Sequence, residues 1–293
     1  MNVLVLGGTS FVGRWIVQDL LDRGHTSTLF TRGRTGADLF PDTARATGDR
    51  DAGDYASIAG TSWEAVVDVS AYVPRHVQEA SAAVSTGRYL FISTGSVYDR
   101  TAAGDGMTED SPRLPPYRES EVVDGDTYGP LKVACEDDVQ DLHGDRATIV
   151  RPGIVAGPHD PTERFTYWTR ATGTVKVPGR LDQPVQVIDA RDLARLVVLL
   201  LEKDQTGIYN AVGPQPAVTL AELIRVCGAE ELVEKEPKPG FPLVLPDQTW
   251  DVMFRRSAAA ALRVGMPTTP LATTAADTRA WDIARGLPDI PVP

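Results

Sequence analysis

Tyr128 and Lys132 stand four residues apart in the segment YGPLK. Residues at this spacing are neighbours on one face of a helix. A phenol ordinarily has a pKa of about 10, and a nearby ammonium favours its phenolate, so the pair could exchange a proton near neutral pH. Any helix can carry such a pair by chance, so its meaning depends on the surrounding elements. Pro130 falls in the first helical turn, where a missing N–H costs little.

A glycine-rich turn near the N-terminus could hold phosphate. Gly7, Gly8 and Gly13 follow an apolar run and precede apolar residues at helical spacing. A sharp turn from a strand into a helix presents unpaired N–H groups and the positive end of the helix dipole, which bind a pyrophosphate. Glycine is needed where a side chain would block the phosphate or the helix contact. The alternative is an ordinary turn without a ligand.

Strands and helices alternate around these residues. Strands are expected at residues 3–6, 27–30, 65–69, 89–92 and 147–150, and helices at about 77–84 and 128–142. Such alternation predicts an α/β fold with a Rossmann-type doubly wound parallel sheet, covered by helices on both faces.

The regular pattern weakens after residues 151–152, where prolines and glycines accumulate. Residues 185–188 regain order and lead into a helix that ends near residue 202. A capping box begins at Thr219, and a weaker version at Thr274 is expected to open a last helix.

This organisation suggests two parts. We expect a dinucleotide-binding Rossmann domain made of residues 1–153 and 185–210. A smaller, irregular substrate-binding lobe is expected from residues 154–184 and 211–293.

The motifs carry a family resemblance. The strand at residues 89–92 runs into the sequence STGSVY, and the tyrosine–lysine pair opens the next helix. The first turn has the spacing G-x-x-G-x-x-G, except that Ser10 replaces the middle glycine. This combination resembles the extended, epimerase/dehydratase-like branch of the short-chain dehydrogenase/reductase family, from Met1 to about Asn210. The turn looks closest to an atypical subgroup near isoflavone-reductase-like and chloroplast stem-loop-binding proteins.

The resemblance implies a catalytic triad of Thr94, Tyr128 and Lys132. In the family, the threonine binds the substrate oxygen and the tyrosine passes a proton, while the lysine holds the nicotinamide ribose and lowers the pKa of the tyrosine. The implied reaction interconverts a secondary alcohol and a ketone. Sugar 4,6-dehydratases of the family carry Asp-Glu after the threonine, where this chain has Gly95 and Ser96, so dehydration is disfavoured.

The cofactor site is expected to favour NADP(H) over NAD(H). NAD-using relatives carry an acid at the end of the second strand, where this chain has Thr31. Arg32 and Arg34 follow, and arginine can bind a 2′-phosphate. Both could equally be solvated loop charges, and Asp49 is either an adenine contact or a solvated turn residue. The resemblance implies cofactor contacts at Gly7, Thr9, Ser10, Phe11, Val12, Gly13, Thr31, Arg32, Arg34, Asp49, Tyr128 and Lys132.

Substrate contacts besides Thr94 are expected in the lobe. Arg164 could receive a phosphate or carboxylate, and Tyr167 and Trp168 could stack on a ring. The alternative is an aromatic core with a surface arginine. The neighbouring pair at residues 255–256 is a second candidate anion clamp, or else a charged helix face.

The composition limits the kinds of partner that we expect for this protein. The chain has 29 basic and 40 acidic residues, a formal charge of −11, which argues against binding nucleic acid through its phosphates. Without a long apolar run or a signal-peptide pattern, we expect a cytoplasmic protein with no membrane partner. Two cysteines and four scattered histidines predict reduced thiols and no metal.

Two functions fit these observations. The first is an NADP(H)-dependent ketoreductase or epimerase of biosynthesis, acting on a sugar nucleotide or a related natural-product intermediate that is anionic or polyhydroxylated. The alternative is a non-catalytic dinucleotide-binding sensor or RNA-binding protein on the same fold. Extended relatives often form homodimers through the helices expected at 77–84 and 128–142, although Asp137, Asp138 and Asp141 make the second helix polar.

Overall fold

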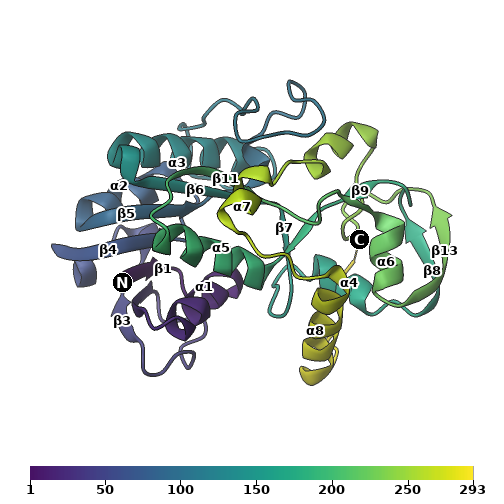
Figure 1. Cartoon of the computed structure of the whole chain (residues 1–293), viewed down its shortest axis with the longest axis horizontal. Coiled ribbons are helices and arrows are strands. Elements are labelled where there is room, and N and C mark those ends of the chain that lie inside the picture. The colour runs from purple at the N-terminus through teal and green to yellow at the C-terminus, as the bar shows by residue number, and fades with distance from the viewer. Residues whose placement is uncertain (293) are drawn as a thin grey trace.

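A seven-stranded parallel sheet forms the centre of the molecule (Figure 1). In the computed structural model, which describes residues 1–292, the strand order is β11-β6-β5-β4-β1-β2-β3. The chain builds the sheet outward in one direction from β1 and in the other direction from β4, so the strand order switches between these two strands. In such sheets ligands bind at the carboxyl ends of the strands beside this switch point. The strands are β1 (Asn2–Leu6), β2 (Thr26–Thr31), β3 (Ala44–Thr47), β4 (Thr61–Asp68), β5 (Val84–Ile92), β6 (Ala147–Pro152) and β11 (Gly207–Ala211).

Two pairs of helices cover the sheet (Figure 1). α1 (Phe11–Asp22) and α5 (Ala190–Glu202) pack on one face, and α2 (Pro74–Ala83) and α3 (Tyr128–His143) pack on the other. Successive side chains of a strand point to opposite faces. In β1, Val3 and Val5 therefore join the apolar core under α1 and α5, whereas Leu4 and Leu6 join the core under α2 and α3.

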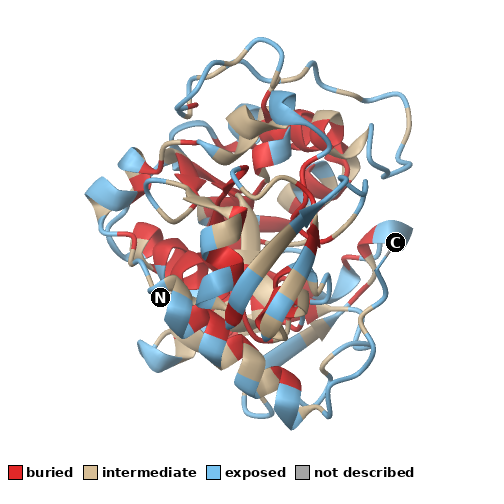
Figure 2. Cartoon of the chain, turned by 90° about the vertical axis from the view of Figure 1, so that its right-hand side faces the viewer, coloured by how far each residue is buried: buried red, intermediate tan, exposed pale blue. Residues whose placement is uncertain are grey.

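The later part of the chain builds a lobe with its own apolar core, which includes Phe165, Leu220 and Leu223. Figure 2 looks onto this side of the molecule and shows buried residues inside and exposed residues along the loops. The lobe strands pair as β7 (Ile154–Ala156) with β10 (Val187–Asp189), β8 (Gly173–Pro178) with β13 (Ala229–Lys235), and β9 (Pro184–Val185) with β12 (Val218–Thr219). Its helices are α4 (Arg164–Thr169), α6 (Leu220–Val226) and α8 (Leu271–Ala284).

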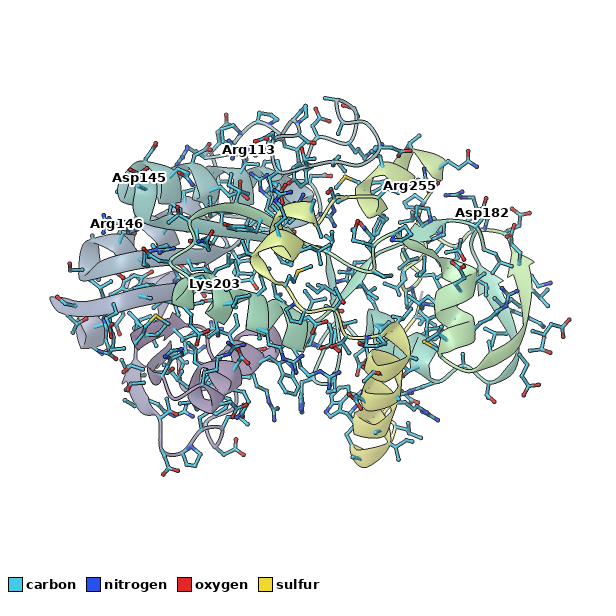
Figure 3. All side chains as sticks on the ribbon, in the orientation of Figure 1. Arg113, Asp145, Arg146, Asp182, Lys203 and Arg255 are labelled. Atoms are coloured by element: carbon cyan, nitrogen blue, oxygen red, sulfur yellow. The ribbon has the colours of Figure 1, made fainter. Side chains whose placement is uncertain are left out.

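One helix of the C-terminal segment returns to the sheet. α7 (Ala259–Val264) packs against β11 and α5. Lys203, labelled in Figure 3, fixes this contact because its Nζ donates to the carbonyl of Val264 at 2.8 Å. The 3₁₀ turns are η1 (Arg50–Ala52), η2 (Ala56–Ile58), η3 (Gly95–Val97), η4 (Gly144–Arg146) and η5 (Gln248–Phe254).

The predicted Rossmann-type sheet is confirmed, and two local predictions are wrong. Val84 does not end a helix; it begins β5 and pairs with Thr61 of β4. Thr274 does not open the last helix, because α8 already starts at Leu271, and its hydroxyl instead donates to Asp189 at 2.7 Å. The capping box that begins at Thr219 is confirmed.

Among residues 1–292, no helix combines the length and apolarity needed to cross a membrane. The same residues contain no group of three or more His, Cys, Asp or Glu side chains arranged to hold a metal ion.

Candidate active site

A cavity of about 480 Å³ lies between the sheet and the lobe. Its wall includes the glycine-rich turn after β1, the residues that follow β5 and β6, the start of α3, and part of the lobe. A second cavity of about 320 Å³ continues along the ends of β1 and β2. The two share Gly7, Ser10, Ser70 and Tyr72, so an elongated ligand could occupy both.

The glycine-rich turn has the geometry of a phosphate site. Gly7 has a φ of 97°, which residues with a Cβ rarely adopt. A Cβ on Gly13 would lie 2.1 Å from the carbonyl oxygen of Gly7, so glycine is required for α1 to approach the turn. Phe11 and Val12 at the start of α1 line the larger cavity, while Ser10 makes no capping hydrogen bond. The unpaired N–H groups of the helix start are available to a phosphate.

Tyr128 and Thr94 meet in the wall of the larger cavity. Tyr128 is the first residue of α3, and Thr94 precedes η3, where its hydroxyl accepts a hydrogen bond from the backbone N–H of Ser96 at 3.2 Å. Gly129 allows the helix to approach this turn, since a Cβ there would lie 2.4 Å from the carbonyl oxygen of Ser96.

The phenol of Tyr128 is shifted toward its protonated form. Burial is the largest effect and raises its pKa above the ordinary value, while hydrogen bonding with Thr94 and the positive charge of Arg164 oppose the rise. At neutral pH the group is therefore a phenol, which can donate a proton to an oxygen in the cavity.

Lys132 lies beneath the cavity and is 2% exposed. Its Nζ donates to the carbonyl oxygens of Ala71 and Ile92, both at 2.8 Å, and stands 4.0 Å from the centroid of the Phe91 ring. Burial lowers the pKa of Lys132 to about 8. An ammonium has three donors, so one remains for a ligand hydroxyl.

The structure changes one expectation about this pair. The groups that most strongly lower the pKa of Tyr128 are Thr94 and Arg164, and Lys132 is not among the leading influences. The ammonium of Lys132 is instead held by two backbone carbonyls.

The smaller cavity contains the residues expected to select the cofactor. Thr31, Arg32, Arg34 and Asp49 all line it. Arg32 lies 3.3 Å from the carboxylate of Asp51, and Arg34 lies 3.8 Å from that of Asp49. Both arginines are exposed, and exposed pairs are weak, so either guanidinium can turn toward a phosphate at little cost. Asp49 also caps η1.

Only one of the three residues expected from α4 reaches a cavity. Arg164 lines the larger one, and its Nε donates to the hydroxyl of Thr162 at 3.2 Å. Within residues 1–292, Tyr167 and Trp168 line neither cavity described above. Trp168 is 1% exposed, donates from its indole N–H to the carbonyl of Pro242, and packs edge-on against Tyr167. The expectation that they stack on a substrate ring is thus corrected: both belong to the aromatic core of the lobe.

Sequence reasoning missed most of the wall that the C-terminal segment supplies. Arg255 and Arg256 are adjacent and indistinguishable in the sequence, but the structure places their side chains in different environments. Arg255, labelled in Figure 3, is exposed and lies 3.1 Å from Asp105, whereas Arg256 is buried in the cavity wall. The paired arginines were the one sequence signal for this segment. Other residues of the larger cavity that the sequence analysis missed include Asp160, Trp250, Met253 and Phe254.

Arg256 occupies the space beside Gly95. A Cβ built on Gly95 would lie 1.1 Å from Nη1 of Arg256. The aspartate that dehydratases carry at this place therefore could not be accommodated unless Arg256 moved.

Solved structures share this fold. UDP-N-acetylglucosamine 4-epimerase from Bacillus cereus superposes with a TM-score of 0.66 at 18% identity, covering 99% of both chains. UDP-glucose 4-epimerase from Thermotoga maritima, solved with UDP-glucose, gives a TM-score of 0.70 at 17% identity and covers 97% of this chain and 99% of that one.

Two curated proteins are similar in sequence. The chloroplast stem-loop binding protein of 41 kDa b from Arabidopsis thaliana is 27% identical over 264 residues, which are 81% of this chain and 66% of that protein. The epimerase family protein SDR39U1 from Bos taurus is 28% identical over 296 residues and 95% of each chain. Residues 3–212 match the family described as NAD dependent epimerase/dehydratase. Because this match covers the sheet, the glycine-rich turn and the Thr94, Tyr128 and Lys132 cluster, the chain belongs to the NAD dependent epimerase/dehydratase family.

Proposed function

We propose that the protein is a nicotinamide-dependent oxidoreductase that interconverts a secondary alcohol and a ketone, as a ketoreductase or an epimerase. The observation that carries the proposal is the meeting of Thr94, Tyr128 and Lys132 at one cavity, next to a turn that can hold a pyrophosphate. We also propose that residues 1–153 and 185–210 bind the dinucleotide and that the lobe of residues 154–184 and 211–293 binds the substrate, as expected from the sequence.

Each member of the cluster has a distinct task. Thr94 binds the substrate oxygen and directs it at Tyr128. In the reductive direction the phenol gives its proton to this oxygen as the carbonyl carbon is reduced, and the raised pKa of Tyr128 keeps the phenol protonated for that step. Lys132 binds a ribose hydroxyl through its remaining donor. The bound nicotinamide would supply or accept the hydride.

The cofactor we propose is NADP(H). Support comes from Thr31 in place of an acid and from Arg32 and Arg34 at the smaller cavity. Fluorescence titration should give roughly tenfold tighter binding of NADPH than of NADH. A variant with Arg32→Gln and Arg34→Gln should lose this preference while its NADH affinity stays unchanged, which is the internal control. Tighter NADH binding by the unmodified protein would refute the preference.

We propose a sugar nucleotide or a related anionic intermediate as the substrate. The Thermotoga maritima neighbour was solved with UDP-glucose, and another neighbour, MoeE5, was solved with UDP-glucuronic acid and NAD. Arg164 offers a positive group in the cavity wall. Dehydration remains disfavoured because Gly95 and Ser96 stand at the dehydratase positions and Arg256 crowds Gly95.

Turnover of NADPH with keto sugar nucleotides, and of NADP⁺ with sugar nucleotides, tests the function. Tyr128→Phe removes the proton donor, so turnover should fall by about 10²–10⁴-fold while NADPH binding persists. Tyr117→Phe is the matched control, because Tyr117 lies outside both cavities. Full turnover by the Tyr128→Phe protein would overturn the assignment.

The stem-loop-binding relative makes RNA binding the second candidate function. The charge of −11 opposes it, because non-specific RNA binding rests on neutralising phosphates. Salt-sensitive binding of structured RNA without turnover of any carbonyl substrate would favour this alternative.

A further inference from the structure

The guanidinium of Arg256 is a buried cation for which residues 1–292 supply no acidic partner. Its side chain lines the larger cavity, and the residue is 4% exposed. Nε and Nη1 have no hydrogen-bond partner within the described chain. A buried charge is normally paired, because removing it from water is costly. Two unsatisfied donors on one buried guanidinium therefore point to a missing acceptor.

The backbone of Arg256 is held in place by two glutamine side chains. Its N–H donates to the amide oxygen of Gln186 at 2.9 Å, and its carbonyl accepts from Nε2 of Gln186 at 2.9 Å and of Gln215 at 2.7 Å. Gln186 is itself 1% exposed. The main chain is thus fixed at a position where the side chain must point into protein or cavity, and its own donors are left unused.

The nearby charges do not neutralise Arg256. Asp160, an acidic residue of the cavity wall, accepts hydrogen bonds from Thr162 at Oδ1, while its Oδ2 is buried without a partner within residues 1–292; it is not among the groups that influence the pKa of Arg256. Burial lowers the pKa of Arg256 to about 10, opposed only by Tyr98. By contrast, the neighbouring Arg255 is exposed and pairs with Asp105 and Asp251.

The guanidinium lies beside the reacting end of the cavity. A Cβ on Gly95, the residue after Thr94, would meet Nη1 of Arg256, and a Cβ on Gly153 would lie 3.1 Å from Nη2. Both positions follow strands whose ends border the catalytic residues. An anion on Arg256 would therefore belong to the part of the substrate that reacts, and a guanidinium fork suits the two oxygens of a carboxylate or phosphate.

We propose that Arg256 is a specificity residue that binds a carboxylate or phosphate group on the reacting portion of the substrate. This inference rests on the proposed function, since it assigns a chemical class to the substrate of that site. The anionic group of the substrate forms an ion pair with Arg256. A neutral analogue would leave the buried charge of Arg256 unpaired and would therefore bind more weakly.

The test measures thermal stability in acetate, phosphate and chloride at matched ionic strength, without cofactor. In chloride, Arg256→Met should raise Tm by about 2–5 °C, because an uncompensated buried charge is removed. Acetate or phosphate should raise Tm of the unmodified protein by about 1–3 °C relative to chloride, and the Arg256→Met protein should lack this part of the response. Phosphate bound at the glycine-rich turn contributes equally to both proteins and cancels. A response to acetate identifies a carboxylate site, and a response to phosphate alone identifies a phosphate site.

The matched control is Arg255→Met, which removes a charge one residue away and should keep the full anion response. A lowered Tm of Arg256→Met in chloride, or an equal anion response in that variant, would overturn the proposal. Failure of both Arg256→Met and Arg256→Gln to fold would also overturn it, because the arginine would then be structural. The outcome is independent of turnover: an Arg256-dependent anion response in a protein that binds no NADPH supports the anion site and refutes the proposed redox function.

Discussion

Burial acts in opposite directions on the two titratable residues at the start of α3. It raises the pKa of Tyr128 and lowers that of Lys132 to about 8, because in each case the low-dielectric surroundings disfavour the charged form. Near neutral pH the site therefore combines a protonated phenol with an ammonium that is close to losing its charge. This pairing suits proton donation to a carbonyl more than proton abstraction from an alcohol.

The first prediction concerns the charge of Lys132. Its ammonium deprotonates as pH rises through about 8, so cofactor binding that uses this charge should be strong below that pH and weaker above it. Because a hydrogen bond loses strength when its donor loses its charge, we expect the NADPH affinity to fall by roughly tenfold between pH 7 and pH 10. Fluorescence titration at a series of pH values measures the change.

Two variants control this experiment. Lys132→Met should bind NADPH weakly at every pH and should lose this component of the pH dependence. Lys203→Met removes a surface lysine at the end of α5 and should keep the profile of the unmodified protein. An affinity that stays constant across pH 8 in the unmodified protein would contradict the assigned role of Lys132.

At the scale of elements, α3 joins the proposed catalytic residues to the sheet. Glu136 lies one turn beyond Lys132 on the same face and is 1% exposed. It accepts a hydrogen bond from Ser93, the residue before Thr94, at 2.5 Å, and two from Arg151 of β6 at 2.9 and 2.7 Å. One buried carboxylate thus fixes the helix that carries Tyr128 and Lys132 against the strand end that carries Thr94.

The second prediction tests this connection. Arg151→Met leaves Glu136 with a weaker set of partners, and breaking such a buried pair should lower the free energy of unfolding by about 3 kcal/mol. Urea denaturation measures the loss. Arg113→Met, which removes a half-exposed partner of the same carboxylate, should cost less than about 1 kcal/mol. Equal losses from the two variants would contradict a special role for the buried pair.

The sequence predicted most of the elements, and it singled out Thr94, Tyr128 and Lys132, which the structure brings to one cavity, because these signals are local. The turn from Gly7 to Gly13 and the tyrosine–lysine spacing follow from constraints within a few residues. The wrong predictions had competing causes. Pairing of Val84 with β4 overrode a helical pattern, and Pro270 started α8 before Thr274 could cap it. The environments of Arg255 and Arg256 depend on long-range packing, which no local pattern encodes.

At the scale of the whole molecule, the lobe and the sheet close one cavity between them. Residues from η5 and the segment after it reach the Thr94, Tyr128 and Lys132 cluster from the far end of the chain, beyond residues 3–212 that match the family. The chain has a net charge of −11, yet among residues 1–292 the wall of the larger cavity contains three basic residues, Lys132, Arg164 and Arg256, and one acidic residue, Asp160. The molecule thus gathers local positive charge where an anionic ligand would bind.

Assembly remains a prediction. Two acidic side chains of α3 that could border a partner are already paired within the chain: Arg113, labelled in Figure 3, pairs with Asp137 at 3.0 Å, and Arg118 pairs with Asp138 at 2.6 Å. A homodimer through α2 and α3 would therefore use other residues of these helices. Sedimentation velocity distinguishes a dimer from a monomer.

Transfer of deuterium from 4-deuterated NADPH to keto sugar nucleotides, followed by mass spectrometry of the products, tests the proposed chemistry most directly. Catalysis at Tyr128 predicts deuterium on the carbinol carbon with the unmodified protein and with Tyr117→Phe, and about 10²–10⁴-fold slower labelling with Tyr128→Phe. Labelling that proceeds equally fast in the Tyr128→Phe protein would contradict it, as would an unmodified protein that neither labels a keto substrate nor epimerises a sugar nucleotide.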